Sequence, residues 1–265
     1  MGRTIAIANQ KGGVGKTTTA VNLGASLAAA ERRVLVVDLD PQGNATSGLG
    51  LRKQEVERGA YDLLCGRAEL GRLVQHTEVA LLDVLPSTRD LAGAAVELVD
   101  VERREYMLKD GLAAARESYD YVMIDCPPSL GLLTLNALTA AEGVLVPMQC
   151  EYFALEGISD LMATLELVRS HINPELEVDG ILLTMFDSRN NLSHQVQEEV
   201  RGFFGEKVFE LVVPRNVRLS EAPSFGKPIL LYDFSSKGSQ AYLRLAQEIL
   251  GRDAARVPVA THSGV

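Results

Sequence analysis

Short runs of apolar residues alternate along the chain with longer segments of helical periodicity. Seven β-branched runs predict strands over residues 3–8, 33–38, 80–86, 121–125, 143–148, 179–186 and 208–214. Most of these runs are continuously apolar, which is typical of strands buried on both faces of a parallel sheet. The segments between them predict helices over residues 16–30, 88–116, 130–141, 154–172, 192–204 and 235–250.

This alternation predicts an α/β fold with a mostly parallel twisted sheet and helices on both faces. The chain has 265 residues, no internal repeat and no Pro/Gly-rich linker, so one domain is expected over residues 1–252. Residues 253–265 lose helical periodicity and end in small and polar residues, which predicts a disordered tail. In such a sheet, ligands bind beyond the carboxyl ends of the strands.

A glycine-rich loop follows the first predicted strand and precedes an apolar helical segment. It consists of Lys11, Gly12, Gly13, Val14, Gly15, Lys16, Thr17 and Thr18. Its backbone N–H groups and the helix N-terminus are suited to phosphate oxygens. We expect Lys16 to neutralise the β and γ phosphates and the Thr17 hydroxyl to bind Mg²⁺. The pattern predicts a P-loop NTPase.

Carboxylates follow two further predicted strands. Asp38 and Asp40 lie at and just beyond the end of strand 33–38, and Asp125 ends strand 121–125. Asp125 is expected to hold Mg²⁺ through water, as a Walker B acid does. Asp40 is placed to orient the attacking water near the metal, whereas Asp38 supports either the magnesium shell or the loop.

The loop departs from the pattern GxxxxGK[ST], because Gln10 replaces the first glycine and Lys11 is an additional lysine. In this form KGGVGKTT resembles the deviant Walker A motif of the ParA/MinD ATPases, and the order DxD then DxPP resembles the switches of that family. The resemblance implies that Lys11 reaches the partner's phosphates in a nucleotide-sandwich homodimer, with Gly12 at the seam, so hydrolysis requires dimerisation. It also implies the hydrolytic role of Asp40.

A Pro-Arg-Asn sequence follows the last predicted strand. It matches the PRN motif of the same family, which implies that Pro214 and Asn216 flank the adenine. Proline gives a flat apolar wall, and an Asn amide can pair with the adenine edge. No NKxD guanine pattern occurs, so ATP is expected rather than GTP.

The phosphate loop starts near residue 10, so we expect no preceding helix-turn-helix domain, and the chain looks like the short Soj/ParA type of partition ATPase. That resemblance implies an ATP-bound homodimer that binds nonspecific double-stranded DNA in the cytoplasm, on the nucleoid. A ParB/Spo0J-like centromere-binding protein would stimulate slow hydrolysis and release the DNA during chromosome or plasmid segregation. The resemblance also implies that Arg189 and Arg218 contact DNA, because they match positions assigned to DNA contact in that type of ATPase.

Charge modifies this expectation. The net charge of −9 argues against constitutive binding to nucleic acid or anionic membranes, but residues 201–265 hold nine basic and six acidic side chains. A dimer would double the number of neutralised phosphates, so an ATP-dependent switch is favoured over binding by the monomer.

Three alternatives compete with this interpretation. A MinD-like membrane-associated positioning ATPase needs a basic amphipathic C-terminal helix, whereas Tyr242, Leu243, Leu245, Ile249 and Leu250 indicate a helix that faces the core. An iron–sulfur electron carrier resembling nitrogenase iron protein needs paired cluster cysteines, and the three cysteines here lack that context. A small-molecule kinase would need an arginine-rich lid.

Overall fold

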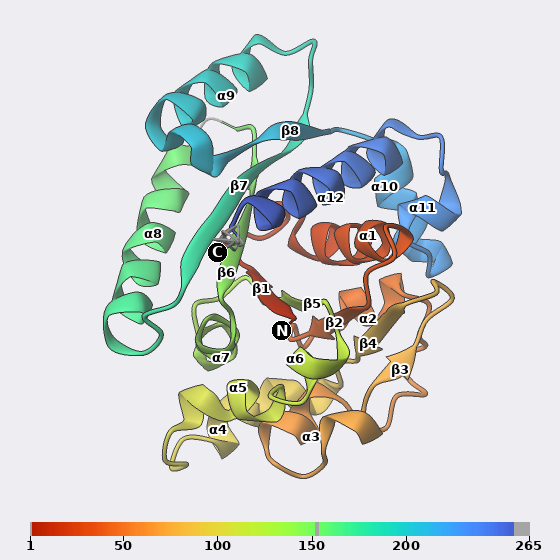
Figure 1. Ribbon diagram of the computed structural model, residues 1–265, viewed down its shortest axis with the longest axis vertical. Coiled ribbons are helices and arrows are strands. Elements are labelled where there is room, and N and C mark those ends of the chain that lie inside the picture. Colours follow the sequence, from red (N-terminus) through yellow and green to blue (C-terminus); the bar gives the residue numbers. More distant parts are fainter. Residues whose placement is uncertain (1, 152–153, 257–265) are drawn as a thin grey trace, which may run out of the picture.

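The computed structural model describes residues 2–151 and 154–256. These residues form an α/β structure around an eight-stranded sheet of order β3-β4-β2-β5-β1-β6-β7-β8 (Figure 1). The strands are β1 (Arg3–Ile7), β2 (Val34–Asp38), β3 (Gln75–His76), β4 (Leu82–Leu85), β5 (Tyr121–Asp125), β6 (Gly143–Gln149), β7 (Glu177–Phe186) and β8 (Val208–Pro214). The short edge strand β3 is antiparallel to β4, and the other neighbouring strands are parallel.

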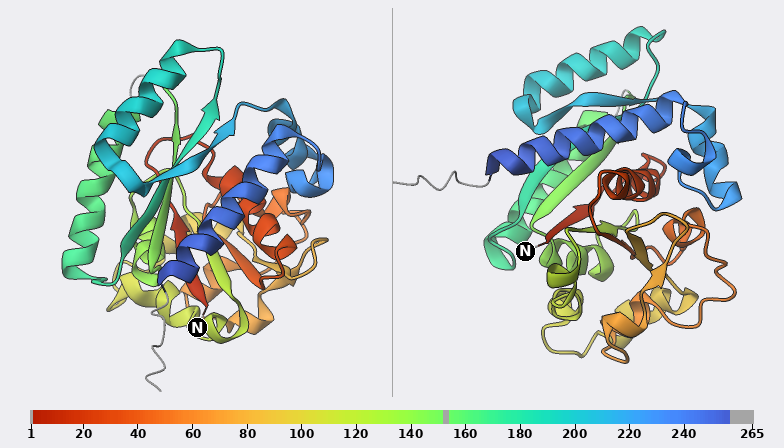
Figure 2. Two further views of the ribbon diagram at one scale, coloured as in Figure 1. Left: turned by 45° about the horizontal axis from the view of Figure 1, so that its top comes forward. Right: turned by 45° about the vertical axis from the view of Figure 1, so that its right-hand side comes forward.

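Helices cover both faces of the sheet. They are α1 (Lys16–Ala29), α2 (Asn44–Gly48), α3 (Ala60–Leu64), α4 (Ala94–Glu97), α5 (Met107–Gly111), α6 (Ala115–Ser118), α7 (Leu132–Ala140), α8 (Ala154–His171), α9 (Asn191–Phe204), α10 (Val217–Glu221), α11 (Ile229–Tyr232) and α12 (Lys237–Arg256). Helices α1 and α12 lie together on one face, while α7 and α8 cover the other (Figures 1 and 2).

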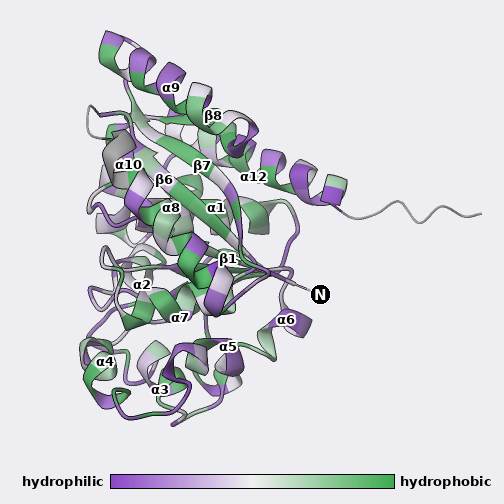
Figure 3. Cartoon of the chain, turned by 90° about the vertical axis from the view of Figure 1, so that its left-hand side faces the viewer, coloured by the Kyte–Doolittle hydropathy of each residue, from purple (hydrophilic) through white to green (hydrophobic). Residues whose placement is uncertain are grey.

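The strands are apolar because each contributes to two cores. Alternate residues of β1 divide between them: Ile5 packs with α1 and α12, whereas Ala6 packs with the core under α7 and α8. Figure 3 shows the mostly hydrophobic colour that this gives to β6 and β7. All seven predicted strands and the parallel sheet are confirmed.

The helix predicted over residues 88–116 is wrong. The segment instead forms α4, α5 and α6, separated by turns of 3-10 helix and loop. Arg103 adopts a left-handed φ of 57°, which no continuous helix allows. Helix α5 ends at Gly111, where an added Cβ would lie 2.8 Å from the Leu63 side chain. The helix therefore ends where the backbone packs closely against Leu63.

The last helix extends beyond the expected domain boundary. Helix α12 continues to Arg256, because Asp253 accepts hydrogen bonds from Arg3 and, at 2.6 Å, from the Tyr121 hydroxyl. These contacts attach the final turn to β1 and β5. The rest of the predicted tail, residues 257–265, lies outside the described residues. The side chains of Tyr242, Leu245 and Ile249 are buried, as expected of a helix facing the core, whereas those of Leu243 and Leu250 are only half-buried.

Candidate nucleotide site

The glycine-rich loop connects the carboxyl end of β1 to the first turn of α1. Gly13 and Gly15 have φ angles of 75° and 91°, the left-handed region that favours glycine, and Gly15 caps α1. Two neighbouring strands fasten the loop: the Thr184 hydroxyl donates to the Val14 carbonyl (2.8 Å), and the Asn9 amide donates to the Pro147 carbonyl (2.7 Å). The loop is therefore preorganised with its N–H groups at a helix N-terminus.

The two lysines of the loop differ in environment. Lys16 is 7% exposed, and its Nζ donates to the Lys11 carbonyl at 3.1 Å. Burial lowers the pKa of Lys16, against the opposing effect of the Asp125 carboxylate. Lys11 is half exposed, and its Nζ lies 2.9 Å from Glu151 Oε2, just after β6. Lys16 is thus buried inside the phosphate loop, whereas Lys11 lies at the surface and is held there by its ion pair with Glu151.

Asp38 and Asp125 are opposite each other in the register of β2 and β5, and both are fully buried. Asp38 accepts hydrogen bonds from the Thr46 hydroxyl (2.6 Å), the Thr46 N–H (2.7 Å) and the Asp40 N–H (3.3 Å). Burial raises the pKa of Asp38 to about 6 despite these donors. Asp38 therefore organises the loop after β2, which matches its predicted supporting role.

Asp125 has weaker support. Neither of its carboxylate oxygens has a hydrogen-bond partner within the geometric limits among the described residues. Burial, followed by repulsion from Asp38, raises its pKa well above the usual range, and the opposing effects of the Thr17 hydroxyl and the Lys16 ammonium do not cancel this shift. An unpartnered buried carboxylate beside a phosphate loop is suited to a divalent cation. The charge of the cation would offset both the desolvation of the carboxylate and its repulsion from Asp38.

Asp40 is 8% exposed at the start of the loop. Its Oδ1 accepts from the Gln42 N–H (2.9 Å) and its carbonyl accepts from the Ser87 hydroxyl (2.8 Å), while Oδ2 makes no hydrogen bond within the described part of the chain. One carboxylate oxygen thus fixes the turn and the other is available.

No group of three His, Cys, Asp or Glu side chains suited to a metal occurs among the described residues. Mg²⁺ characteristically binds one or two protein oxygens together with substrate phosphates and water. Thr17 and Asp125 therefore fit a magnesium ion that is completed by a nucleotide, and they do not form an all-protein metal cage. Cys126 and Cys150 are buried free thiols whose pKa values are raised by burial, which suits neither cluster ligation nor nucleophilic chemistry.

The residues assigned to adenine lie three strands away from the loop, at the end of β8. Asn216 caps α10, with Oδ1 accepting from the Arg218 N–H at 2.9 Å. The acceptor of this amide is therefore in use, and its NH₂ group is the part available to a base. Pro214 ends β8, opposite Phe186 of β7.

Arg189 and Arg218 follow the neighbouring strands β7 and β8. Arg189 forms a bidentate pair with Asp187 (3.0 and 2.9 Å) and lowers the pKa of that carboxyl to about 2. Arg218 pairs with Glu221 at 2.9 Å and Asp233 at 3.5 Å. Both guanidinium groups are largely exposed, so a phosphate would exchange with these carboxylates.

Sequence reasoning missed two contacts of the site. Glu151 is brought to Lys11 by the pairing of β6 with β1, and no sequence spacing signals it. Thr184 supports the loop from β7, and its position at the end of a buried strand was the only available signal. Among the described residues, no helix is long and apolar enough to cross a membrane.

Comparison with known proteins identifies close relatives. A family model described as an AAA domain matches residues 2–178. The chain is 59% identical to the chromosome partitioning protein ParA of Myxococcus xanthus, over 97% of this chain and 91% of that protein. It is also 59% identical to the sporulation initiation inhibitor protein Soj of Bacillus subtilis, over 94% of this chain and 98% of that protein.

The fold is likewise shared with solved structures. A crystal structure described as cobyrinic acid a,c-diamide synthase from Mycobacterium smegmatis, with bound ATP analogue and magnesium, has a TM-score of 0.85. It is 39% identical and covers 96% of this chain and 97% of its own. Proteins with different names thus share this fold. The fold alone therefore does not identify the binding partner, which must be inferred from the residues at the surface.

Proposed function

The chain belongs to the ParA/Soj family of chromosome-partitioning ATPases, and from this membership we propose that it is an ATP-dependent dimerising switch for chromosome or plasmid segregation. It hydrolyses ATP to ADP and phosphate. In the proposal, the ATP-bound homodimer binds nonspecific double-stranded DNA on the nucleoid in the cytoplasm. A ParB-like centromere-binding protein stimulates hydrolysis and releases the DNA.

The unpartnered carboxylate of Asp125 is the observation that carries the nucleotide part of the proposal. A magnesium ion bound with ATP would supply the missing positive charge and neutralise the phosphates. The Thr17 hydroxyl and Asp125 would hold it, with Asp40 near its water shell. The backbone from Gly12 to Thr18 would bind the phosphates, and Lys16 would place its charge on the β and γ phosphates.

Asp40 and Lys11 are the proposed hydrolytic residues. The free oxygen of Asp40 would orient the attacking water while its other oxygen keeps the loop in place. Lys11 would leave Glu151 and reach the partner's phosphates, acting in trans as an arginine finger does. The site would be complete only in the dimer, so the chain alone should hydrolyse ATP slowly. Pro214 and the NH₂ group of Asn216 would contact the adenine.

The DNA part of the proposal depends on Arg189 and Arg218. Both are exposed cations beyond the carboxyl ends of adjacent strands, and guanidinium groups bind phosphate oxygens in a bidentate manner. Two such residues per subunit give few contacts in a monomer, and dimerisation would double them.

The decisive experiment measures binding to a long nonspecific duplex with ATP, with ADP and without nucleotide, at two salt concentrations. We expect salt-sensitive binding with ATP and none with ADP or without nucleotide, and we expect weaker binding in Arg218→Ala. Arg52→Ala is the matched control, because Arg52 is also exposed and also pairs with a glutamate three residues later. If ATP dimerises the protein and no DNA binds, the DNA proposal fails, and binding to anionic liposomes would instead favour the MinD-like alternative.

A further inference from the structure

The chain that leaves β4 meets the loop that carries Asp40. Strands β2 and β4 are parallel neighbours, and Val37 is opposite Leu85 in their register. Both chains therefore leave the sheet side by side at its carboxyl edge, where Ser87 lies against Asp40. Ser87 is 2% exposed although it belongs to a loop, so its polar groups must find partners inside the protein.

Ser87 finds these partners in the loop after β2. Its hydroxyl donates to the Asp40 carbonyl at 2.8 Å, and its N–H donates to the Thr46 hydroxyl at 2.9 Å. The Thr46 hydroxyl in turn donates its single proton to Asp38 Oδ2 at 2.6 Å, which leaves its oxygen free to accept from Ser87. These contacts form a buried network that runs from the carboxylate of Asp38 to the backbone of Asp40.

Ser87 is the buried anchor of the turn at residues 40–44. The Asp40 carbonyl also accepts from the Gly43 N–H at 2.8 Å, so the turn is closed by its own backbone. Beyond the turn and α2, the described structure donates hydrogen bonds to residues 40–44 only through Ser87 and Lys53. The Lys53 contacts are exposed and compete with water. A pocket of about 690 Å³ borders the turn, which leaves the turn room to shift if the buried contact is removed.

We propose that Ser87 is a positioning residue for ATP hydrolysis. Its hydroxyl fixes the backbone of Asp40 and thereby keeps the free carboxylate oxygen of Asp40 in place for the attacking water. This inference rests on the proposed role of Asp40. Ser87 is too deeply buried to touch the nucleotide, and its hydroxyl proton is used by the Asp40 carbonyl, so it acts only through Asp40. A displacement of about 1 Å in a positioning group can lower a rate by roughly a hundredfold.

Single-turnover ATP hydrolysis by Ser87→Ala tests the proposal, with magnesium present and at protein concentrations where the rate no longer rises. We expect the rate constant to fall about three- to tenfold, as the loss of one hydrogen bond allows. The dissociation constant of a fluorescent ATP analogue and ATP-dependent dimerisation in sedimentation should stay unchanged. A purely structural role would instead lower the melting temperature and leave the rate constant of the folded protein as it was, which would overturn the proposal.

Ser26→Ala is the matched control. Ser26 is also 2% exposed, and its hydroxyl also donates to a backbone carbonyl, that of Asn22, at 2.7 Å within α1. Its replacement should leave the rate constant unchanged, and equal losses in the two alanine variants would overturn the proposal. Thr46 supplies a second comparison: Thr46→Ser keeps the hydroxyl and should retain most of the rate, whereas Thr46→Val should lose as much as Ser87→Ala. If Ser87→Ala does not fold, equal rates in the two Thr46 variants overturn the proposal.

Asp40→Asn separates this inference from the function on which it rests. If Asp40→Asn abolishes hydrolysis while Ser87→Ala hydrolyses ATP at the wild-type rate, positioning by Ser87 is wrong and the role of Asp40 stands. If Asp40→Asn hydrolyses ATP at the wild-type rate, the proposed role of Asp40 is wrong, and positioning by Ser87 fails with it.

Discussion

At the scale of single residues, Asp125 is a buried acid that destabilises the nucleotide-free protein and is proposed to hold magnesium. Its carboxylate is fully buried, lacks hydrogen bonds in the described structure and faces Asp38 across the β2–β5 pairing. Replacement by the isosteric amide removes the charge and its repulsion. We expect Asp125→Asn to raise the free energy of unfolding of the nucleotide-free protein by roughly 1–3 kcal/mol and to abolish magnesium-dependent ATP hydrolysis.

Urea unfolding without nucleotide and a hydrolysis assay measure these two effects. Asp38→Asn is the comparison, because Asp38 accepts three hydrogen bonds and its replacement should lower stability. A nucleotide-free Asp125→Asn protein that is less stable than the wild type would show that the attraction between Asp125 and Lys16 outweighs the cost of burying the carboxylate.

The contact between Lys11 and Glu151 is a second feature of residue scale. Both side chains are half exposed, so their ion pair stabilises the free chain by less than about 1 kcal/mol. Glu151→Gln would release Lys11 for the partner subunit, and we expect up to about fivefold tighter ATP-dependent dimerisation. Sedimentation measures it, with Glu55→Gln as a control for an exposed pair elsewhere. Weaker dimerisation would indicate that Glu151 contributes directly to the interface.

The residues of the site were predictable to different degrees. Lys16, Thr17 and Asp125 follow from chain order, because a loop after the first strand and an acid after a neighbouring parallel strand must meet at one edge of the sheet. The contact of Lys11 with Glu151 depends on which strand lies beside β1. Sequence periodicity carries no information on that order.

At the scale of elements, Asp179 joins β7 to β1 and α12. Its Oδ1 accepts from Arg3 and, at 3.1 Å, from Arg256, while Oδ2 is buried without a partner in the described structure. Burial raises the pKa of Asp179 to about 6, which outweighs the opposing effect of Arg3. Desolvation therefore exceeds the attraction of the ion pairs at this junction.

This imbalance predicts a pH effect on stability. The unfolded chain releases the Asp179 proton near pH 4 and the folded chain near pH 6, so stability from this group is full below the lower value and falls as pH rises to the upper one. The change amounts to roughly 3 kcal/mol. Urea unfolding should show this fall in the wild type relative to Asp179→Asn. Asp187→Asn is the control, since the lowered pKa of Asp187 places its titration below this range. Parallel pH profiles for wild type and Asp179→Asn would refute the prediction.

The elements themselves show where periodicity is informative. Strands buried on both faces are continuous apolar runs, so all seven were evident. The segment 88–116 has apolar residues at helical spacing, yet the left-handed backbone of Arg103 interrupts it, and the short α5, which ends at Gly111, packs against α3 and α7. Tertiary packing overrides local preference there, and the short helices α10 and α11 are too brief to generate a periodic signal.

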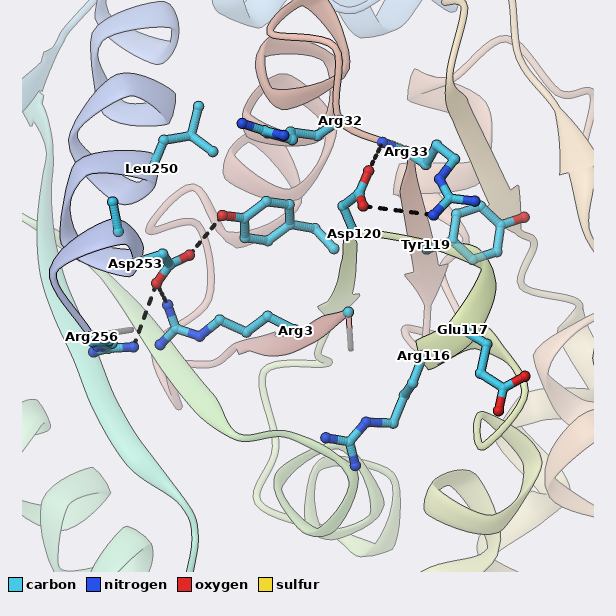
Figure 4. Close-up of a pocket in the computed structure, with 13 residues that line it drawn as sticks. Arg3, Arg32, Arg33, Arg116, Glu117, Tyr119, Asp120, Leu250, Asp253 and Arg256 are labelled. Carbon is cyan, nitrogen blue, oxygen red and sulfur yellow. Dashed lines mark hydrogen bonds and ion pairs between the residues drawn. The ribbon is translucent and has the colours of Figure 1, made fainter. Parts of the chain in front are cut away.

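At the scale of the whole molecule, the two edges of the sheet have different chemistry. The carboxyl edge carries the phosphate loop, the acids and the two proposed DNA arginines, while the amino edge carries a pocket lined by five arginines, four of which form ion pairs with carboxylates (Figure 4). With a net charge of −9, the chain as a whole repels DNA. In the proposed function, local cations would have to overcome that repulsion, and a dimer that presents two sets of them would do so best.

Salt dependence tests this balance. A dimer that presents Arg189 and Arg218 twice would neutralise about four phosphates, so log K should fall with log[NaCl] with a slope of about −3.6, and Arg218→Ala should reduce it to about −1.8. Glu221→Gln acts in the opposite direction, because it releases Arg218 from its carboxylate partner and should tighten binding severalfold at constant salt. Filter binding with ATP over a range of NaCl concentrations measures the DNA affinity of the wild type, Arg218→Ala and Glu221→Gln. An unchanged slope in Arg218→Ala would show that this arginine stays paired with Glu221 on the DNA, and the duplex would then have to lie on another face of the dimer.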